Sequence, residues 1–175
     1  MHNLIQSAQK IRLLILDVDG VLTNGELTYG ANGITQKTFH VHDGQGIKLM
    51  QQSGVTVAII TAKNSPMVAQ RMADLDVTHV YQGYADKLIA YADLKTKLNL
   101  TDEAIAYIGD DIYDLPLLKR VGLGITVANA PDPLHEHAHF STRLKGGEGA
   151  VREVCDFIMK SQGTYQQAID IFLKR

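Results

Sequence analysis

The sequence contains a single cysteine, Cys155, and no tryptophan among its 175 residues. One cysteine excludes an intrachain disulfide, which suits a reducing compartment and predicts a cytoplasmic protein. No apolar run approaches the roughly 20 residues that span a membrane, and the first residues lack the apolar stretch of a signal peptide. Neither sign of charge dominates, because 17 Lys and Arg oppose 19 Asp and Glu. We therefore expect no membrane and no nucleic-acid partner, since proteins that bind nucleic acids are commonly basic.

The composition is that of an ordinary folded protein. Hydrophobic residues make up 45% of the chain and charged residues 21%, enough apolar surface for a buried core. The length suits one domain, and we expect residues 1–175 to form it. Within it we expect a hairpin flap at about 25–40 and a C-terminal helix or tail at about 162–175.

Apolar, β-branched runs alternate along the chain with segments of helical periodicity. The runs predict strands at 12–18, 55–61, 104–108 and 123–127, and a weaker one at 78–81. Helices are predicted at 43–53, 65–75, 85–98, 112–119, 148–160 and 165–174. This alternation predicts an α/β fold with a Rossmann-like parallel sheet flanked by helices. One insertion interrupts it, because residues 26–29 and 34–39 flank a glycine-containing turn and predict a β-hairpin after the first strand.

Two carboxylates, Asp17 and Asp19, follow the first predicted strand. They could simply cap a turn, as Asp often does. The alternative is catalysis, in which Asp17 attacks phosphorus and Asp19 acts as general acid and base. Two carboxylates so close together call for a cation, and Mg²⁺ prefers oxygen ligands.

A second acidic cluster, Asp110, Asp111 and Asp114, follows the strand at 104–108. Acids also stabilise helix N-termini, which is the simpler explanation. In parallel sheets, however, ligands bind beyond the carboxyl ends of the strands, where Asp17 also lies. We expect Asp110 to be a metal ligand, and Asp111 and Asp114 to bind the metal through water or to orient Lys87.

Two further polar residues could contact a phosphoryl group. Thr61 ends a predicted strand, so its hydroxyl could hold a phosphoryl oxygen, although it could also be an ordinary strand residue. Lys87 begins a predicted helix and could neutralise both the phosphoryl group and the acidic cluster. The alternative for Lys87 is a solvated surface lysine.

Together, Asp17-x-Asp19-Gly-Val-Leu-Thr, Thr61, Lys87 and Gly109-Asp110-Asp111-x-x-Asp114 resemble the four motifs of the haloacid dehalogenase-like phosphotransferase superfamily. Along nearly its full length the chain is similar to the family of 3-deoxy-D-manno-octulosonate 8-phosphate (KDO 8-phosphate) phosphatases. The stretches that carry this resemblance are LLILDVDGVLTNG, FHVHDGQGIKLM, THVYQGYADKL, YIGDDIYDLP and GGEGAVREVCD. The resemblance implies a fold without a large cap domain, a homotetramer, and Mg²⁺-dependent hydrolysis of a small-molecule sugar phosphate in lipopolysaccharide precursor synthesis.

The resemblance also implies roles for individual residues. Asp17 matches the nucleophile and Asp19 the acid/base, while Asp17, Asp19 through its backbone carbonyl, and Asp110 match the metal ligands. Thr61 and Lys87 match catalytic contacts to the phosphate. Besides Asp19 and Lys87, the matched substrate-binding residues are His40, Val41, His42, Asp43, Gly44, Lys48, Lys63 and Arg71.

Several residues depart from the family's pattern. Family members often carry Arg where this chain has His42, Lys48, Lys63 and Glu148, and Asn in place of His40. Only Arg offers a planar fork to a carboxylate, so these changes bear on the choice of sugar. The alternative function is therefore a phosphatase for another acidic sugar phosphate, such as a nonulosonate 9-phosphate. A more remote alternative is a non-catalytic binding protein.

A run of alternate histidines, His135, His137 and His139, could indicate zinc, but no cysteine lies nearby. We expect it to lie on an exposed helix or loop. Cys155 has helical core spacing with its apolar neighbours, which predicts a buried structural cysteine.

Overall fold

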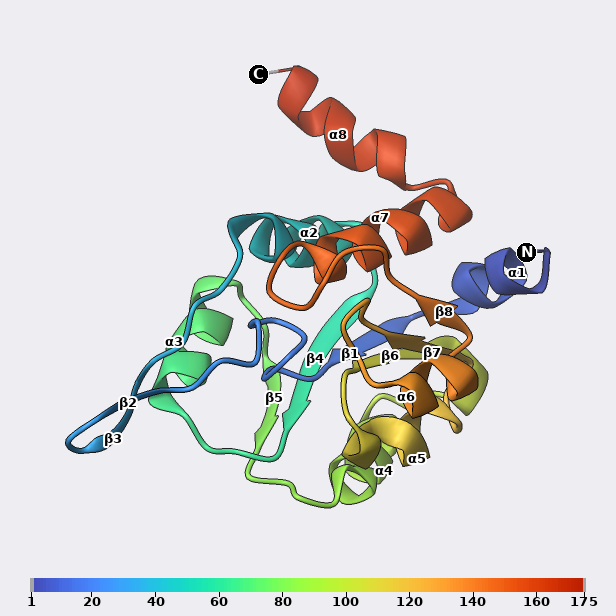
Figure 1. Ribbon diagram of the computed structural model, residues 1–175. Helices are drawn as coiled ribbons and strands as arrows, with labels where there is room; N and C mark the ends of the chain where they lie inside the picture. The colour runs from blue at the N-terminus through green and yellow to red at the C-terminus, as the bar shows by residue number, and fades with distance from the viewer. Residues whose placement is uncertain (1, 175) are drawn as a thin grey trace.

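A parallel sheet of six strands organises the chain in the computed structural model, which describes residues 2–174 (Figure 1). The strand order is β5-β4-β1-β6-β7-β8, and every neighbouring pair is parallel. The strands are β1 Leu13–Leu16, β4 Thr56–Thr61, β5 His79–Gln82, β6 Ile105–Gly109, β7 Leu123–Thr126 and β8 Phe140–Ser141. The predicted α/β fold class is therefore confirmed.

Helices cover both faces of the sheet, which explains why the central strands are apolar throughout. On one face α2 packs on α7 and α7 on α1, while on the other α4 contacts β4 and α5 contacts β6 (Figure 1). The longer helices are α1 His2–Lys10, α2 Val41–Gln52, α3 Pro66–Asp74, α4 Lys87–Lys97, α7 Ala150–Gln162 and α8 Tyr165–Leu173. The shorter ones are α5 Leu115–Leu118, α6 Asp132–His137 and the 3₁₀ helices η1 Asp102–Ala104 and η2 Ile112–Asp114. In the described part of the chain, no helix has the length and apolar character needed to cross a bilayer.

Two elements project from the body of the molecule (Figure 1). The antiparallel pair β2 Thr28–Gly30 and β3 Gly33–Gln36 forms a hairpin after β1, shorter than the hairpin predicted from the sequence. Helix α8 packs mainly on α7, and Ile171, Phe172 and Leu173 near its end are exposed.

The sequence analysis missed some elements and misplaced others. Helix α1 was not predicted, yet Leu4 and Ala8 pack into the core, and Gln162 donates hydrogen bonds to the carbonyls of Ala8 and Ile11. The predicted helix at 112–119 divides into η2 and α5, because Asp111 and Asp114 form a capping box that closes a 3₁₀ turn first. Cys155 is buried on α7, as predicted.

The alternate histidines have structural contacts. The ring of His135 lies 2.9 Å from the Ser141 hydroxyl and 2.9 Å from the Ala130 carbonyl oxygen. The Nδ1 atom of His139 accepts a hydrogen bond from the Gly124 backbone. These contacts link α6 to β8, and the residue before β8 to β7. His135 is half-buried rather than exposed, while His137 and His139 are exposed as predicted.

Candidate active site

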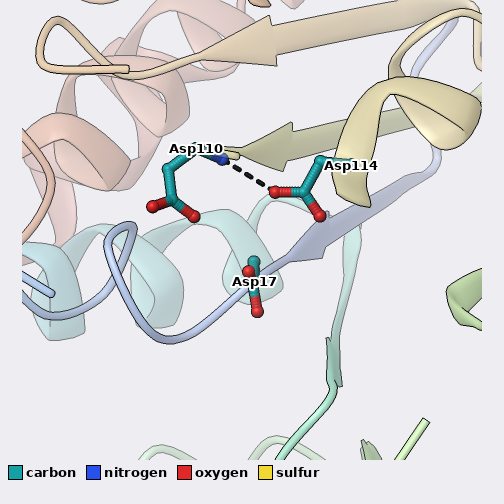
Figure 2. Close-up of side chains that lie close together, drawn as sticks. All are labelled: Asp17, Asp110 and Asp114. Carbon is teal, nitrogen blue, oxygen red and sulfur yellow. Dashed lines mark hydrogen bonds between the residues drawn. The ribbon is translucent and has the colours of Figure 1, made fainter. Parts of the chain in front are cut away.

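The carboxyl ends of β1, β4 and β6 lie side by side, which brings the predicted catalytic residues to one edge of the sheet. Asp17 follows β1 and Asp110 follows β6, its neighbour in the sheet. Figure 2 shows the side chains of Asp17, Asp110 and Asp114 grouped at this edge. Gly20, in the loop after β1, has φ of +87°, and a side chain there would overlap the Asp110 carboxylate. The close approach of the two loops therefore requires glycine at this position.

Lys87, the first residue of α4, is the central cation of this group. Its Nζ atom lies 2.8 Å from Oδ2 of Asp17 and 2.6 Å from Oδ1 of Asp114. Lys87 is only 6% exposed, so it is not the solvated surface lysine of the alternative reading. The Asp86 side chain caps α4 by accepting from the Leu88 backbone, which fixes the start of the helix beside the acidic cluster.

A fifth member of the group, Tyr107, was not identified from the sequence. It lies on β6, is fully buried, and its hydroxyl accepts a hydrogen bond from Lys87 at 3.0 Å. The same hydroxyl donates to Oδ1 of Asp114 at 2.6 Å. In the sequence Tyr107 belongs to an apolar strand, and nothing local to it indicates these polar partners.

Both carboxylate oxygens of Asp114 accept hydrogen bonds from the protein. Oδ1 accepts from Lys87 and Tyr107. Oδ2 accepts from the backbone N–H of Asp110 at 2.9 Å (Figure 2), and from that of Asp111 at 3.2 Å. A carboxylate accepts about four hydrogen bonds, so Asp114 has no lone pair left for a metal. It accepts a hydrogen bond from Lys87, the contact that one of its two predicted roles, orienting Lys87, requires. Asp111 is exposed and caps the following turn through the Ile112 N–H.

Asp19 faces lysines from two different loops. The Lys37 ammonium, just after β3, pairs with Oδ1, and Lys63 Nζ lies 3.9 Å from Oδ2. Lys37 is thus a second residue that the sequence analysis missed. It ties the base of the hairpin to the loop that follows β1.

Burial shifts the ionisation of the acidic residues. Desolvation raises the pKa of Asp17 to about 6, against the opposing effect of Lys87. Desolvation, and then the charges of Asp17 and Asp114, raise the pKa of Asp110 to about 8. Burial disfavours the charge on Lys87, but Asp17 and Asp114 outweigh it and raise the pKa of the ammonium. Burial also holds the pKa of Tyr107 well above its ordinary value, so the hydroxyl remains neutral.

The carboxylates fit a divalent cation with oxygen ligands. Single oxygens of Asp17, Asp110 and Asp114 lie within 4.8 Å of one another, but those of Asp114 already have donors. Asp17 and Asp110 are the remaining candidates, and burial raises the pKa of both carboxyl groups in spite of the nearby Lys87. Hard oxygen donors of this kind are the ligands that Mg²⁺ prefers.

A cleft of about 560 Å³ opens over this group. Besides the acidic residues and Lys87, its lining includes Gly25, Ala62, Lys63, Ala85 and Tyr113. Thr61 is buried at the end of β4, directly before Ala62, and it does not itself line the cleft.

Of the substrate-binding residues implied by the resemblance, Lys63 is the one outside the catalytic group that lines the cleft. The others lie on or beside α2 and α3: His40 accepts from the His42 backbone, Val41 is exposed, and Lys48 pairs with Asp76 at 3.1 Å. Arg71 packs against Gly44 and lies over the Phe39 ring.

Asp43 and Glu148 also lie away from the cleft. Asp43 is buried, and its Oδ1 accepts from the Arg152 backbone at 2.8 Å, within the first turn of α7. Glu148 lines a separate cavity that includes His42 and Arg152. In this single chain, therefore, the contacts implied for the sugar are not gathered around Asp17.

Comparison with known proteins decides the family. The sequence model of the haloacid dehalogenase-like hydrolases matches residues 76–154. The chain is 48% identical to 3-deoxy-D-manno-octulosonate 8-phosphate phosphatase KdsC of Escherichia coli K12, over 95% of this chain and 88% of that protein. The chain belongs to the 3-deoxy-D-manno-octulosonate 8-phosphate phosphatase family. The match with the Escherichia coli protein spans 166 residues, nearly the whole chain.

Solved structures of this family have the same fold. A crystal structure of the family's enzyme from Moraxella catarrhalis, in complex with magnesium ion, phosphate ion and KDO, superposes with a TM-score of 0.95. That match has 40% identity and covers 98% of this chain and 99% of that chain. The family's enzyme from Yersinia pestis gives a TM-score of 0.92 at 46% identity, covering 94% of this chain and 89% of that one.

Proposed function

We propose that the chain hydrolyses KDO 8-phosphate to KDO and inorganic phosphate with Mg²⁺, as a step in lipopolysaccharide precursor synthesis. The observation that carries the proposal is the pairing of Asp17 with Lys87 beside Asp110, in a chain closely related to enzymes with this activity. An acidic cluster with one buried lysine suits the transfer of a phosphoryl group, which depends on positioning and charge compensation.

In the first step, an oxygen of Asp17 forms a bond to phosphorus as the bond from phosphorus to the sugar oxygen breaks. Asp19 gives a proton to that leaving oxygen, and an aspartyl phosphate remains on Asp17. In the second step, Asp19 takes a proton from a water molecule, whose oxygen attacks phosphorus. Phosphate leaves, and the Asp17 carboxylate is restored.

Lys87 and Thr61 compensate the charge of the transferring group. The Lys87 ammonium is already aimed at Asp17, and we assign the Thr61 hydroxyl to a phosphoryl oxygen. The residues that would hold Mg²⁺ are Asp17, Asp110 and the backbone carbonyl of Asp19. When bound, the ion supplies positive charge against the phosphoryl oxygens and the two carboxylates.

A second candidate is a phosphatase for another acidic sugar phosphate, such as a nonulosonate 9-phosphate. It is favoured by Lys63, which lines the cleft and stands where family members often carry Arg. The two candidates share the chemistry and differ in leaving group. We would compare kcat/KM for KDO 8-phosphate, a nonulosonate 9-phosphate and p-nitrophenyl phosphate. A preference for KDO 8-phosphate supports the first candidate, and a preference for the nonulosonate ester supports the second.

We also propose that the protein acts as a cytoplasmic homotetramer. Two observations support assembly: the hairpin and α8 project from the body with exposed Tyr29 and Leu173, and the implied sugar contacts on α2 lie apart from the cleft of their own chain. A neighbouring copy could supply what a single cleft lacks. Mass measurement by light scattering tests this, since a monomer at micromolar concentration would contradict it.

A further inference from the structure

We propose that Tyr107 is a positioning residue that holds the Lys87 ammonium against Asp17, an inference that rests on the proposed phosphatase reaction. Tyr107 does not line the cleft, and its side chain is completely buried. It therefore acts on the reaction through Lys87 and Asp114.

The hydrogen-bond capacity of Lys87 is filled by the protein. An ammonium has three N–H donors, and three acceptors lie within reach: Asp17 at 2.8 Å, Asp114 at 2.6 Å and Tyr107 at 3.0 Å. Two of these acceptors are carboxylates and Tyr107 is the neutral one. With all three in place, the ammonium has one orientation, in which one N–H faces Asp17.

Tyr107 also fixes the second acceptor. Its O–H donates to Asp114 at 2.6 Å, so Tyr107, Asp114 and Lys87 form a closed triangle of hydrogen bonds. The backbone of Tyr107 is held on β6 opposite Ile15 of β1, two residues before Asp17. The hydroxyl therefore fixes the position of Lys87 relative to β1, the strand that Asp17 follows.

This geometry affects the rate of phosphoryl transfer, because the Lys87 ammonium stabilises the transition state best when it does not have to move during the reaction. Without the hydroxyl, Lys87 would keep a buried N–H with no acceptor and Asp114 would lose a donor. The ammonium would then settle between the two carboxylates. Phenylalanine retains the ring, whose centroid lies 5.8 Å from Lys87 Nζ, so Tyr107→Phe removes the hydroxyl alone.

The chain contains a matched control in Tyr91, which lies on α4 and whose partner Asp102 precedes β6. Tyr91 is also buried, and its hydroxyl donates to Asp102 at 2.5 Å, where Lys95 pairs with the same oxygen. Asp102 lies in η1, before β6, whereas Asp114 lies beyond its carboxyl end. Tyr91→Phe thus makes the same chemical change in a similar cluster away from the site.

The experiment measures kcat and KM of the wild type, Tyr107→Phe and Tyr91→Phe with saturating Mg²⁺, for KDO 8-phosphate and p-nitrophenyl phosphate. We expect Tyr107→Phe to lower kcat about tenfold for both substrates, with KM within about twofold, because Lys87 acts on the phosphoryl group that the substrates share. Tyr91→Phe is expected to leave kcat unchanged. A wild-type kcat in Tyr107→Phe, or a loss confined to the sugar phosphate, would overturn the inference.

A double-mutant cycle separates positioning from general destabilisation. In Lys87→Met there is no ammonium to position, so adding Tyr107→Phe should lower kcat no further. A further tenfold loss would contradict the role assigned to Tyr107. If Tyr107→Phe does not fold, Tyr107→Met takes its place with the same expectations. A wild type inactive on both substrates would refute the proposed function itself, which is a different outcome from an active Tyr107→Phe.

Discussion

The Nζ atom of Lys87 lies 2.8 Å from Oδ2 of Asp17, joining the first residue of α4 to the residue that follows β1. Around this pair the cleft is lined by five aspartates and only two lysines, Lys63 and Lys87. The pair therefore forms inside an excess of negative charge. That excess is the physical reason to expect a divalent cation at the site.

Mg²⁺ should stabilise the folded protein through Asp110. A ligand that binds only the folded state raises the melting temperature, so we expect Mg²⁺ to raise the Tm of the wild type. Asp110→Asn should abolish most of this increase. Asp111→Asn is the matched control, because Asp111 is exposed on the same loop and its amide oxygen could still cap Ile112. Differential scanning calorimetry tests this, and an equal response in all three proteins would contradict the metal assignment.

The metal-free protein should lose stability as the pH rises. Folding raises the pKa of Asp17 to about 6 and of Asp110 to about 8, from an ordinary value of 3.8. The folded state therefore holds protons that the unfolded state has released. The stabilisation that these retained protons supply is fully present below the ordinary pKa of 3.8. It is lost as the pH rises through about 6 for Asp17 and about 8 for Asp110.

We expect the Tm in EDTA to fall between about pH 4 and about pH 8, and to fall less in Asp110→Asn, which has one fewer carboxyl group with a raised pKa. Added Mg²⁺ should reduce the decline in the wild type. Melting curves across this range provide the measurement. A Tm that rises with pH by the same amount in both proteins would show that Asp110 ionises normally.

The sequence was sufficient to predict five of the six strands of the sheet, all but β8, and to bring Asp17 and Asp110 to one edge of it, for a specific physical reason. Strands buried on both faces are apolar runs, and polar residues at their carboxyl ends meet at one edge. Asp17 and Asp110 were placed together by this argument. The role of Tyr107 could not be found in the same way, because a tyrosine within an apolar strand has the pattern of a core residue. Its partners come from α4 and η2, and three-dimensional structure alone brings them to it.

Helix α1 and the environment of Asp43 were missed for related reasons. Helix α1 has few apolar residues, and its contacts with α7 stabilise it. Asp43 was assigned to the substrate through the resemblance, whereas the structure places its carboxylate at the first turn of α7, which has no capping side chain of its own. Asp43 reaches the start of α7 only because α2 packs on α7, and that packing cannot be read from the local sequence.

Asp43 should support the packing of α2 on α7. Asp43→Ala removes the acceptor for the Arg152 N–H, and we expect the free energy of unfolding to fall by about 1–2 kcal/mol. Asp43→Asn keeps an acceptor oxygen and removes the buried carboxylate, whose charge burial disfavours, as the raised pKa of Asp43 shows. The free energy of unfolding should therefore fall less in Asp43→Asn than in Asp43→Ala. Urea denaturation measures both variants, and equal losses would contradict the capping role.

The Thr61 hydroxyl should matter for turnover and little for folding. Thr61→Val preserves the shape of the side chain at the end of β4 and removes the hydroxyl, so we expect kcat/KM to fall about 100-fold. Thr61→Ser retains the hydroxyl and should keep most of the activity. Steady-state kinetics of the two variants tests the assignment, and a Val variant as active as the Ser variant would remove Thr61 from the site.

Asp17 as the nucleophile of a Mg²⁺-dependent sugar-phosphate phosphatase is the central claim. The most direct measurement is phosphate release from KDO 8-phosphate by the wild type with Mg²⁺, by the wild type in EDTA, and by folded Asp17→Asn with Mg²⁺. We predict release in the first reaction and a loss of at least about 1,000-fold in the other two. Substantial release by pure Asp17→Asn, or equal release with and without Mg²⁺, would contradict the account.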